Sequence, residues 1–145
     1  WDQLVLFSGS HLEYVQLSWA HNGVNVEGDG VVLRHSKFRD SLWSCVDIFS
    51  KDTIVEDNEI YHCWHQGVGV KTHSGNVIRN NFIHDAWLAV NCEYGAQPEI
   101  TGNRFIAAPV SADCPSGEKN TQEERPIDTR GGTFGKQLIY PAQKE

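Results

Sequence analysis

A repeat of about 22 residues runs through most of this chain and constrains its fold more than any other feature. A first column of large apolar residues recurs in steps of 21, 22, 23 and 22: Leu12, Leu33, Val55, Ile78 and Ile100. A second column follows five positions later: Leu17, Phe38, Ile60, Ile83 and Phe105. Such units bury their apolar faces only by stacking on their neighbours, so the pattern predicts a solenoid of about five coils over residues 1–109.

Within each repeat, apolar and polar residues alternate, which is the period of β-strands and not of helices. The clearest strands are four triplets with an outward middle residue: Val24–Val26, Val46–Ile48, Val68–Val70 and Val90–Cys92. Each coil should contain two more strands, one at the Leu33 column and one ending at the Phe38 column. Turns rich in Gly, Asp, Asn and Ser separate them. The pattern therefore predicts an all-β protein, a parallel β-helix with three short strands per coil.

A column of asparagines supports the same fold. Asn58, Asn81 and Asn103 stand three positions after the first apolar column. Asparagine tolerates the left-handed backbone of a sharp bend, and stacked amides donate and accept hydrogen bonds along the column. We therefore expect an asparagine ladder at one corner of the coils.

Residues 110–145 differ in kind, because they are polar, rich in turn formers and without the repeat. We interpret them as an irregular C-terminal extension that either caps the stack or is partly disordered. The segment QLIY, residues 137–140, would add one strand to the stack.

Charge and hydropathy argue against two classes of partner. The net charge is −7, and most of the acidic excess lies in the repeat region, which disfavours nucleic acid. No run of residues approaches the roughly 18 to 20 apolar residues of a membrane span. The sequence has no methionine, even at position 1, which fits either a processed product that has lost a secretory signal or a part of a longer chain.

The four cysteines form neither a close-spaced metal motif nor a C-x-x-C pair. Cys45, Cys63 and Cys92 occupy different columns of the repeat, so disulfides between adjacent coils would require a distorted Cα spacing. Cys114, in the extension, could reach one of them. We expect at least two of the four to be buried thiols.

The segments TIVEDNEIYHCWHQGVGVKTHSGNVIRNNFIHDAWLAVN and EITGNRF, with the opening WDQLVLFSGSHLEYVQLSWAHNGVNV, resemble the right-handed parallel β-helix superfamily, the pectate-lyase-like proteins. The resemblance implies a right-handed helix and a secreted protein, extracellular or periplasmic. It does not select a reaction, because the scaffold carries lyases, hydrolases, epimerases and inert spikes. Relatives generally use one strand set and the loops that lead into it.

That strand set and its loops bring polar and aromatic side chains to one ridge. Aromatic rings beside carboxylates and amides suit sugars, which have apolar faces and rims of hydroxyls. The alternative is that each tryptophan covers an exposed edge of the core. The candidate substrate-binding residues are Trp43, Trp64, Trp87, Asn25, Asn91 and Glu93, with Trp19 on the same side.

Lys71 is the sharpest catalytic candidate, together with Asp47 and His65. The segment KTHSGN, residues 71–76, is similar to the K-S-x-x-x-N segment of β-helix lyases that cleave chondroitin and alginate, in which the lysine is the Brønsted base. Two departures count against that role: Glu93 stands where those lyases have a general-acid arginine, and Gln66 replaces a calcium-binding glutamate. We expect Lys71 to be ion-paired with Glu93 and Asp47 and therefore to stay protonated.

A second column consists of Asp40, His62 and Asp85, on successive coils. Two carboxylates with an imidazole between them could act as the acid and base of an inverting hydrolase. They could also bind a divalent cation such as calcium, with help from His65 or His84. We favour a third interpretation, a charge-balanced structural stack.

Two functions follow from these patterns. The first is a secreted carbohydrate-active protein that binds a polysaccharide and, if it is an enzyme, cleaves it as a lyase or glycoside hydrolase. Its acidic groove favours a neutral glycan unless calcium bridges the charges. The second is a non-catalytic solenoid, a spacer, adhesin or filament subunit that self-associates or joins a longer chain through exposed coil ends. Neither function requires a cofactor other than a divalent cation.

Overall fold

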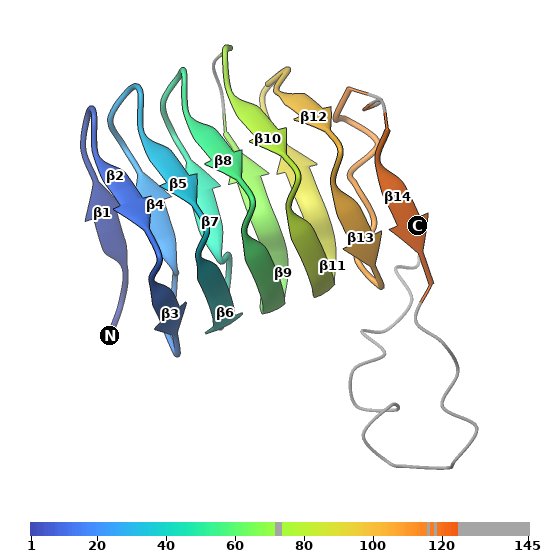
Figure 1. The fold of residues 1–145 in the computed structure, drawn as a ribbon, viewed down its shortest axis with the longest axis horizontal. Coiled ribbons are helices and arrows are strands. Elements are labelled where there is room, and N and C mark those ends of the chain that lie inside the picture. Colours follow the sequence, from blue (N-terminus) through green and yellow to red (C-terminus); the bar gives the residue numbers. More distant parts are fainter. Residues whose placement is uncertain (72–73, 116, 118, 125–145) are drawn as a thin grey trace.

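The computed structural model describes residues 1–71, 74–115, 117 and 119–124, and these residues form a stack of β-coils (Figure 1). Corresponding strands of successive coils lie side by side from the N-terminal end to the last described coil. None of the described residues forms a helix long and apolar enough to cross a membrane. The predicted all-β solenoid of parallel strands is confirmed.

The strands form two parallel sheets that enclose the core. The smaller sheet contains the middle strand of each coil: β2 (His11–Glu13), β5 (Val32–Arg34), β8 (Ile54–Glu56), β10 (Val77–Arg79) and β12 (Glu99–Thr101). The larger sheet contains the other strands: β1 (Leu4–Leu6), β3 (Gln16–Ser18), β4 (Val24–Val26), β6 (Lys37–Ser41), β7 (Val46–Ile48), β9 (Glu59–Val70), β11 (Phe82–Cys92), β13 (Arg104–Ile106) and β14 (Thr121–Glu123).

The apolar columns of the sequence are the inward columns of the structure. Leu33 pairs with Val55 and Val55 with Ile78, while Phe38 pairs with Ile60 and so on along the stack. These side chains are buried, because each lies between the same column position of the coil before and the coil after. The period alone therefore gives the register of the coils correctly.

The prediction of three separate short strands per coil is wrong in the third and fourth coils. There β9 and β11 are long strands that turn a corner and pair with each other on both sides of it, with a shift of register between Ala86 and Leu88. The corner in each is made by a single residue with positive φ, His62 (53°) in β9 and Asp85 (54°) in β11. The residues expected in loops before the candidate site, Trp64, His65 and Trp87 among them, are consequently strand residues.

An amide ladder fixes a second corner, as predicted. The Oδ1 atom of Asn81 accepts from the backbone N–H of Asn58 (3.0 Å) and from its Nδ2 (3.1 Å), and Asn103 does the same for Asn81. Each Nδ2 also donates to a backbone carbonyl of the preceding coil, Val55 in the case of Asn81 (2.8 Å). The ladder is longer than the sequence repeat showed. Ser36 begins it, and Asn120 extends it into the last coil.

Stacking continues beyond residue 109, where we placed the start of the extension. β14 pairs in parallel with β13, and Val90 forms a bridge with Val110. Asn120 was missed because it follows Asn103 by 17 residues instead of about 22. The predicted strand QLIY lies outside the described residues, as does the part of the predicted capping or partly disordered extension (110–145) that follows Glu124.

All four cysteines form disulfides, so the expectation of buried thiols is wrong. Cys45 is bonded to Cys63 across a Cα separation of 5.5 Å, and Cys92 is bonded to Cys114. The repeat pattern predicts contacts only between residues that stand in the same column of successive coils. Cys45 and Cys63 both point inward from either side of a corner, and residues in different columns meet there.

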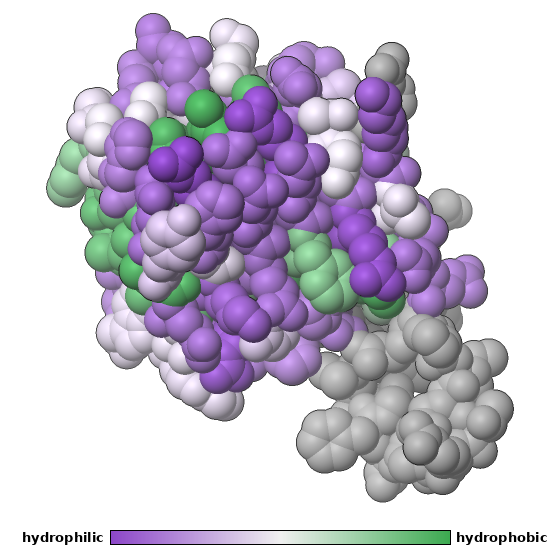
Figure 2. Space-filling model, viewed as in Figure 1, coloured by the Kyte–Doolittle hydropathy of each residue, from purple (hydrophilic) through white to green (hydrophobic). Residues whose placement is uncertain are grey.

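The outward face of the smaller sheet is mostly hydrophilic, as Figure 2 shows for the side where β5, β8 and β10 lie nearest the viewer. Ion pairs join neighbouring coils on this face, with Arg34 2.8 Å from Glu13 and Arg79 2.6 Å from Glu56. Because these pairs are exposed to solvent, each contributes little to stability.

Replacing the central rung of the ladder tests how much the corner contributes. In Asn81→Ala, the buried N–H of Asn58 and the carbonyl of Val55 lose their partners, so we expect a loss of about 3 kcal/mol in the free energy of unfolding. Asn81→Ser should lose less, because Ser36 already serves as a rung with its hydroxyl. Chemical denaturation measures both. Equal stability of the two variants would contradict a hydrogen-bonding role for this column.

Candidate functional site

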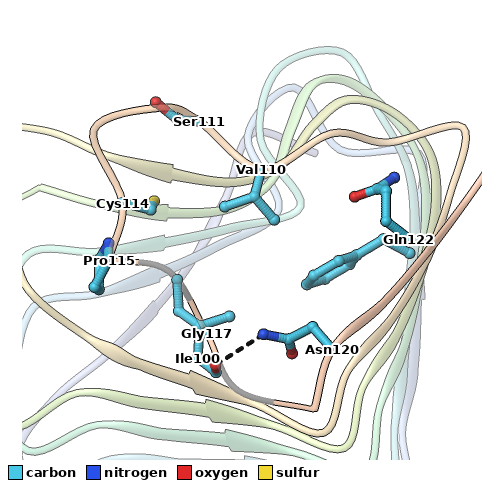
Figure 3. A pocket seen from close by; sticks show the side chains of 9 residues that line it. Ile100, Val110, Ser111, Cys114, Pro115, Gly117, Asn120 and Gln122 are labelled. Atoms are coloured by element: carbon cyan, nitrogen blue, oxygen red, sulfur yellow. Dashed lines mark hydrogen bonds between the residues drawn. The ribbon is translucent and has the colours of Figure 1, made fainter.

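The hollow at the C-terminal end of the stack is not the candidate site. It has a volume of about 280 Å³, and Figure 3 shows its lining residues around the open end of the core. Asn120 donates there to the carbonyl of Ile100 (2.9 Å). Among the described residues that line it, none is ionisable, since Cys114 is in a disulfide, so these residues supply no acid, base or charged ligand-binding group.

A ring of five polar side chains lies on the outward side of the larger sheet. Asp47 comes from β7, Gln66 from β9 and Asn91 from β11, and Lys71 and Glu93 follow β9 and β11 directly. Gln66 donates to Asp47 (2.7 Å), Asn91 donates to Gln66 (2.8 Å) and to Glu93 (3.0 Å), and Lys71 donates to Glu93 (2.7 Å). Lys71 Nζ also lies 3.5 Å from Asp47, which closes the ring. We call these five residues the polar ring.

Gly69 makes room for the polar ring. It stands between Asp47 and Asn91 in the same outward column, at the one position of the three without a side chain. A Cβ at this position would overlap the amide nitrogen of Gln66 and the carboxylate of Asp47. The Gln66 side chain occupies this space and links the coils on both sides.

Burial sets the proton affinity of Asp47. The residue is 2% exposed, and this desolvation raises the pKa of its carboxyl group, although Lys71 and Gln66 stabilise the charged form. The ion pairs predicted for Lys71 are both present, because its ammonium lies between Glu93 and Asp47. The Lys71 side chain is therefore held between two carboxylates of the ring.

A ridge of aromatic side chains lies next to the polar ring. The Trp43 and His65 rings are stacked, with centroids 4.4 Å apart and an interplanar angle of 11°. On the other side of His65, the Trp87 ring lies at 6.0 Å. The backbone N–H of His65 in β9 donates to the carbonyl of Trp43 (3.0 Å), which lies between β6 and β7, and this bond joins the two coils at the stacked rings. Trp64, adjacent to His65, is 62% exposed.

His65 connects the ridge to the polar ring. Desolvation lowers its pKa, and the ammonium of Lys71 lowers it further, against the opposing effects of Asp47 and Glu93. Its Nδ1 atom is buried and has no hydrogen-bond partner among the described residues. The imidazole is thus favoured in its neutral form and keeps one unpaired polar atom between two indole rings.

Two of the predicted binding residues are placed differently from the rest. Asn25 is only 7% exposed, and its Nδ2 donates to Gln3 (2.8 Å). Its side chain is therefore largely inaccessible to a ligand. Trp19 is 72% exposed with a φ of 64°, at a corner of the first coil. The structure brings together Trp43, Trp87, Asn91 and Glu93 with the three catalytic candidates Asp47, His65 and Lys71.

The column of Asp40, His62 and Asp85 is a column of corner residues. All three have positive φ, between 53° and 55°, a conformation that Asp and His adopt more readily than most residues. His62 Nδ1 lies 3.1 Å from Asp40, as the stack predicts, whereas Asp85 bonds to His84 (2.8 Å), the residue before it in the chain. Within the described part of the chain, no group of three His, Cys, Asp or Glu side chains is arranged to hold a metal ion.

Sequence reasoning missed the part that Gln66 and Gly69 play. The sequence identified Gln66 only as the residue that replaces a calcium-binding glutamate of the lyases. In the structure it is fully buried and forms hydrogen bonds to two neighbouring coils. The available signal was the interruption of a polar column, Asn25, Asp47 and Asn91, by a glycine. Such a gap in an outward column indicates that another side chain fills it.

Comparison with protein families gives one match. A family model described as "Right handed beta helix region" matches residues 6–119, which includes every residue of the polar ring and the ridge. Comparison with curated proteins and with solved structures gives no significant match.

Asp47→Asn tests the effect of burial on the ring. The raised pKa means that wild type loses a contribution to stability as pH rises through the folded-state pKa of Asp47, whereas asparagine stays neutral. Asparagine still offers an oxygen to Gln66. We therefore expect the stability of the variant, relative to wild type, to increase as the pH rises above about 4, the ordinary pKa of an aspartate. Asp29→Asn, at an exposed turn, controls for net charge. A difference that stays constant or falls with pH would contradict the prediction.

Proposed function

Because this chain belongs to the right-handed β-helix family, in which stacked side chains fill the interior, we propose that its function resides in the outward ridge and polar ring. The protein is proposed to be the β-helix domain of a secreted carbohydrate-active protein. Its partner would be a polysaccharide, bound on Trp43, His65 and Trp87 beside the polar ring.

The observation that carries this proposal is the placement of stacked, partly exposed rings directly beside fixed hydrogen-bonding groups. Trp43 is 45% exposed and Trp87 is 37% exposed, so their faces are available to a ligand. A sugar ring offers an apolar face for the indoles and hydroxyl groups for the carboxylate, amide and ammonium groups of the polar ring. Both requirements are met on adjacent coils of one sheet.

Secretion is supported by the cysteines. Both disulfides join neighbouring coils, and the described residues include no free cysteine. Disulfides persist in oxidising compartments and are rare in reducing ones. An extracellular or periplasmic location is therefore part of the proposal.

Removing one indole should weaken glycan binding. In Trp43→Ala the sugar loses its stacking surface and His65 loses its neighbour, so we expect affinity for a bound oligosaccharide to fall by about tenfold or more. Tyr14→Ala is a matched control, because Tyr14 also stacks on a histidine, His35, but at another corner of the first coil. A glycan array followed by calorimetry measures both variants. An equal loss of affinity in Trp43→Ala and Tyr14→Ala would contradict binding at the ridge.

Binding without cleavage is the second candidate, and one observation favours it. Asp47 and His65 have pKa values shifted in opposite directions, as an acid and base pair requires, yet Asp47 is 2% exposed. A proton donor must come within hydrogen-bond reach of the glycosidic oxygen, and the polar ring covers this carboxyl group. A non-catalytic solenoid, acting as a spacer or adhesin, fits this geometry.

We accordingly expect no turnover of the glycans that bind. Reducing-sugar release and the ultraviolet absorbance of unsaturated uronates, followed over long incubations with neutral and uronic polymers, would measure it. Product formation that disappears in His65→Ala, while oligosaccharide binding persists, would show that the protein is an enzyme and that His65 takes part in the reaction.

A further inference from the structure

We infer that the polar ring selects uncharged sugar residues, by accepting hydrogen bonds from their hydroxyl groups, and rejects uronates. This inference rests on the glycan-binding function proposed above. It concerns the class of sugar that the ring admits next to the aromatic ridge.

The free hydrogen-bonding atoms of the ring are mainly acceptors. Asn91 uses its Nδ2 for both Gln66 and Glu93, and no group among the described residues donates to its Oδ1. Glu93 accepts from Lys71 and Asn91 through Oε1, which leaves Oε2 without a donor in the described part of the chain. A hydroxyl can donate to these two oxygens, whereas a carboxylate has only acceptors.

Lys71 does not reverse this preference. Its ammonium donates to Glu93 (2.7 Å) and forms an ion pair with Asp47 (3.5 Å), and its side chain is only 16% exposed. A single ammonium therefore faces two carboxylates, and the neighbouring His65 is favoured as the neutral imidazole. Above the pKa of Asp47, the ring keeps one uncompensated negative charge, which repels a carboxylate on the ligand.

The experiment compares oligosaccharides that differ only at C6. Neutral gluco-, galacto- and manno-oligosaccharides are each paired with the C6-oxidised uronate of the same length and linkage. Calorimetry with the full chain, in the presence of a chelator, gives the ratio of affinities for each pair. We expect the neutral member to bind at least about tenfold more tightly.

Glu93→Gln changes the charge of the ring while keeping its geometry. The amide oxygen of glutamine can still accept from Lys71 and Asn91. The position of Oε2 then becomes an NH2 donor, so we expect the neutral ligand to lose affinity and the uronate to gain it, and the ratio to fall toward one. Lys71→Gln should shift the ratio in the opposite direction, because it leaves both carboxylates uncompensated. Glu56→Gln, on the smaller sheet, makes the same charge change far from the ring and should leave the ratio unchanged.

The outcomes separate this inference from the function on which it rests. Uronates that bind as tightly as their neutral partners, or a ratio that is the same in wild type and Glu93→Gln, would overturn the selectivity while leaving glycan binding intact. Tight uronate binding that appears only when calcium replaces the chelator would also overturn it, since the surplus charge would then recruit a cation. Absence of binding to every member of both classes would overturn the proposed function itself.

Discussion

The register between coils is the constraint on which the rest of this structure depends, and the amide ladder is its most specific element. Each rung bonds both to the next rung and to a backbone carbonyl of the coil before it. A coil shifted by one residue would lose these bonds and would also turn its apolar column outward. The buried ladder therefore fixes which outward residues become neighbours, including the members of the polar ring, which come from three strands far apart in sequence.

The polar ring shows how a regular scaffold produces an irregular site. The backbone repeats from coil to coil, so differences in chemistry arise only from the side chains placed on it. At one outward column the structure has a carboxylate, then a glycine, then an amide. The missing side chain allows Gln66 to bond to the coils on both sides of it, and its hydrogen bond to Asp47 partly offsets the rise in pKa that burial imposes on that carboxyl group.

The sequence predicted contacts along the stack well and contacts around the corners poorly. Leu33, Val55 and Ile78 stack as expected, because the period converts directly into register. The Cys45–Cys63 disulfide was not expected, because it joins different columns whose side chains meet only when the coil bends. Asp40, His62 and Asp85 were identified as a column, but their part in turning the chain depends on φ, which the pattern of residue types does not reveal. The role of Gln66 was missed for a related reason. It depends on the hydrogen bonds of Gln66 to Asp47 and Asn91 in other coils, which its position in the repeat does not predict.

The two disulfides have a consequence for how such a stack comes apart. Each coil is held mainly by its neighbours, so opening should start at the outer coils and travel inward one coil at a time. The Cys45–Cys63 bond lies on the N-terminal side of the polar ring, and the Cys92–Cys114 bond joins the coil of Asn91 to the last described segment. Fraying that begins on either side therefore meets a covalent barrier before it reaches the ring. The middle of the stack can keep the ridge and the polar ring intact while the outer coils open and close.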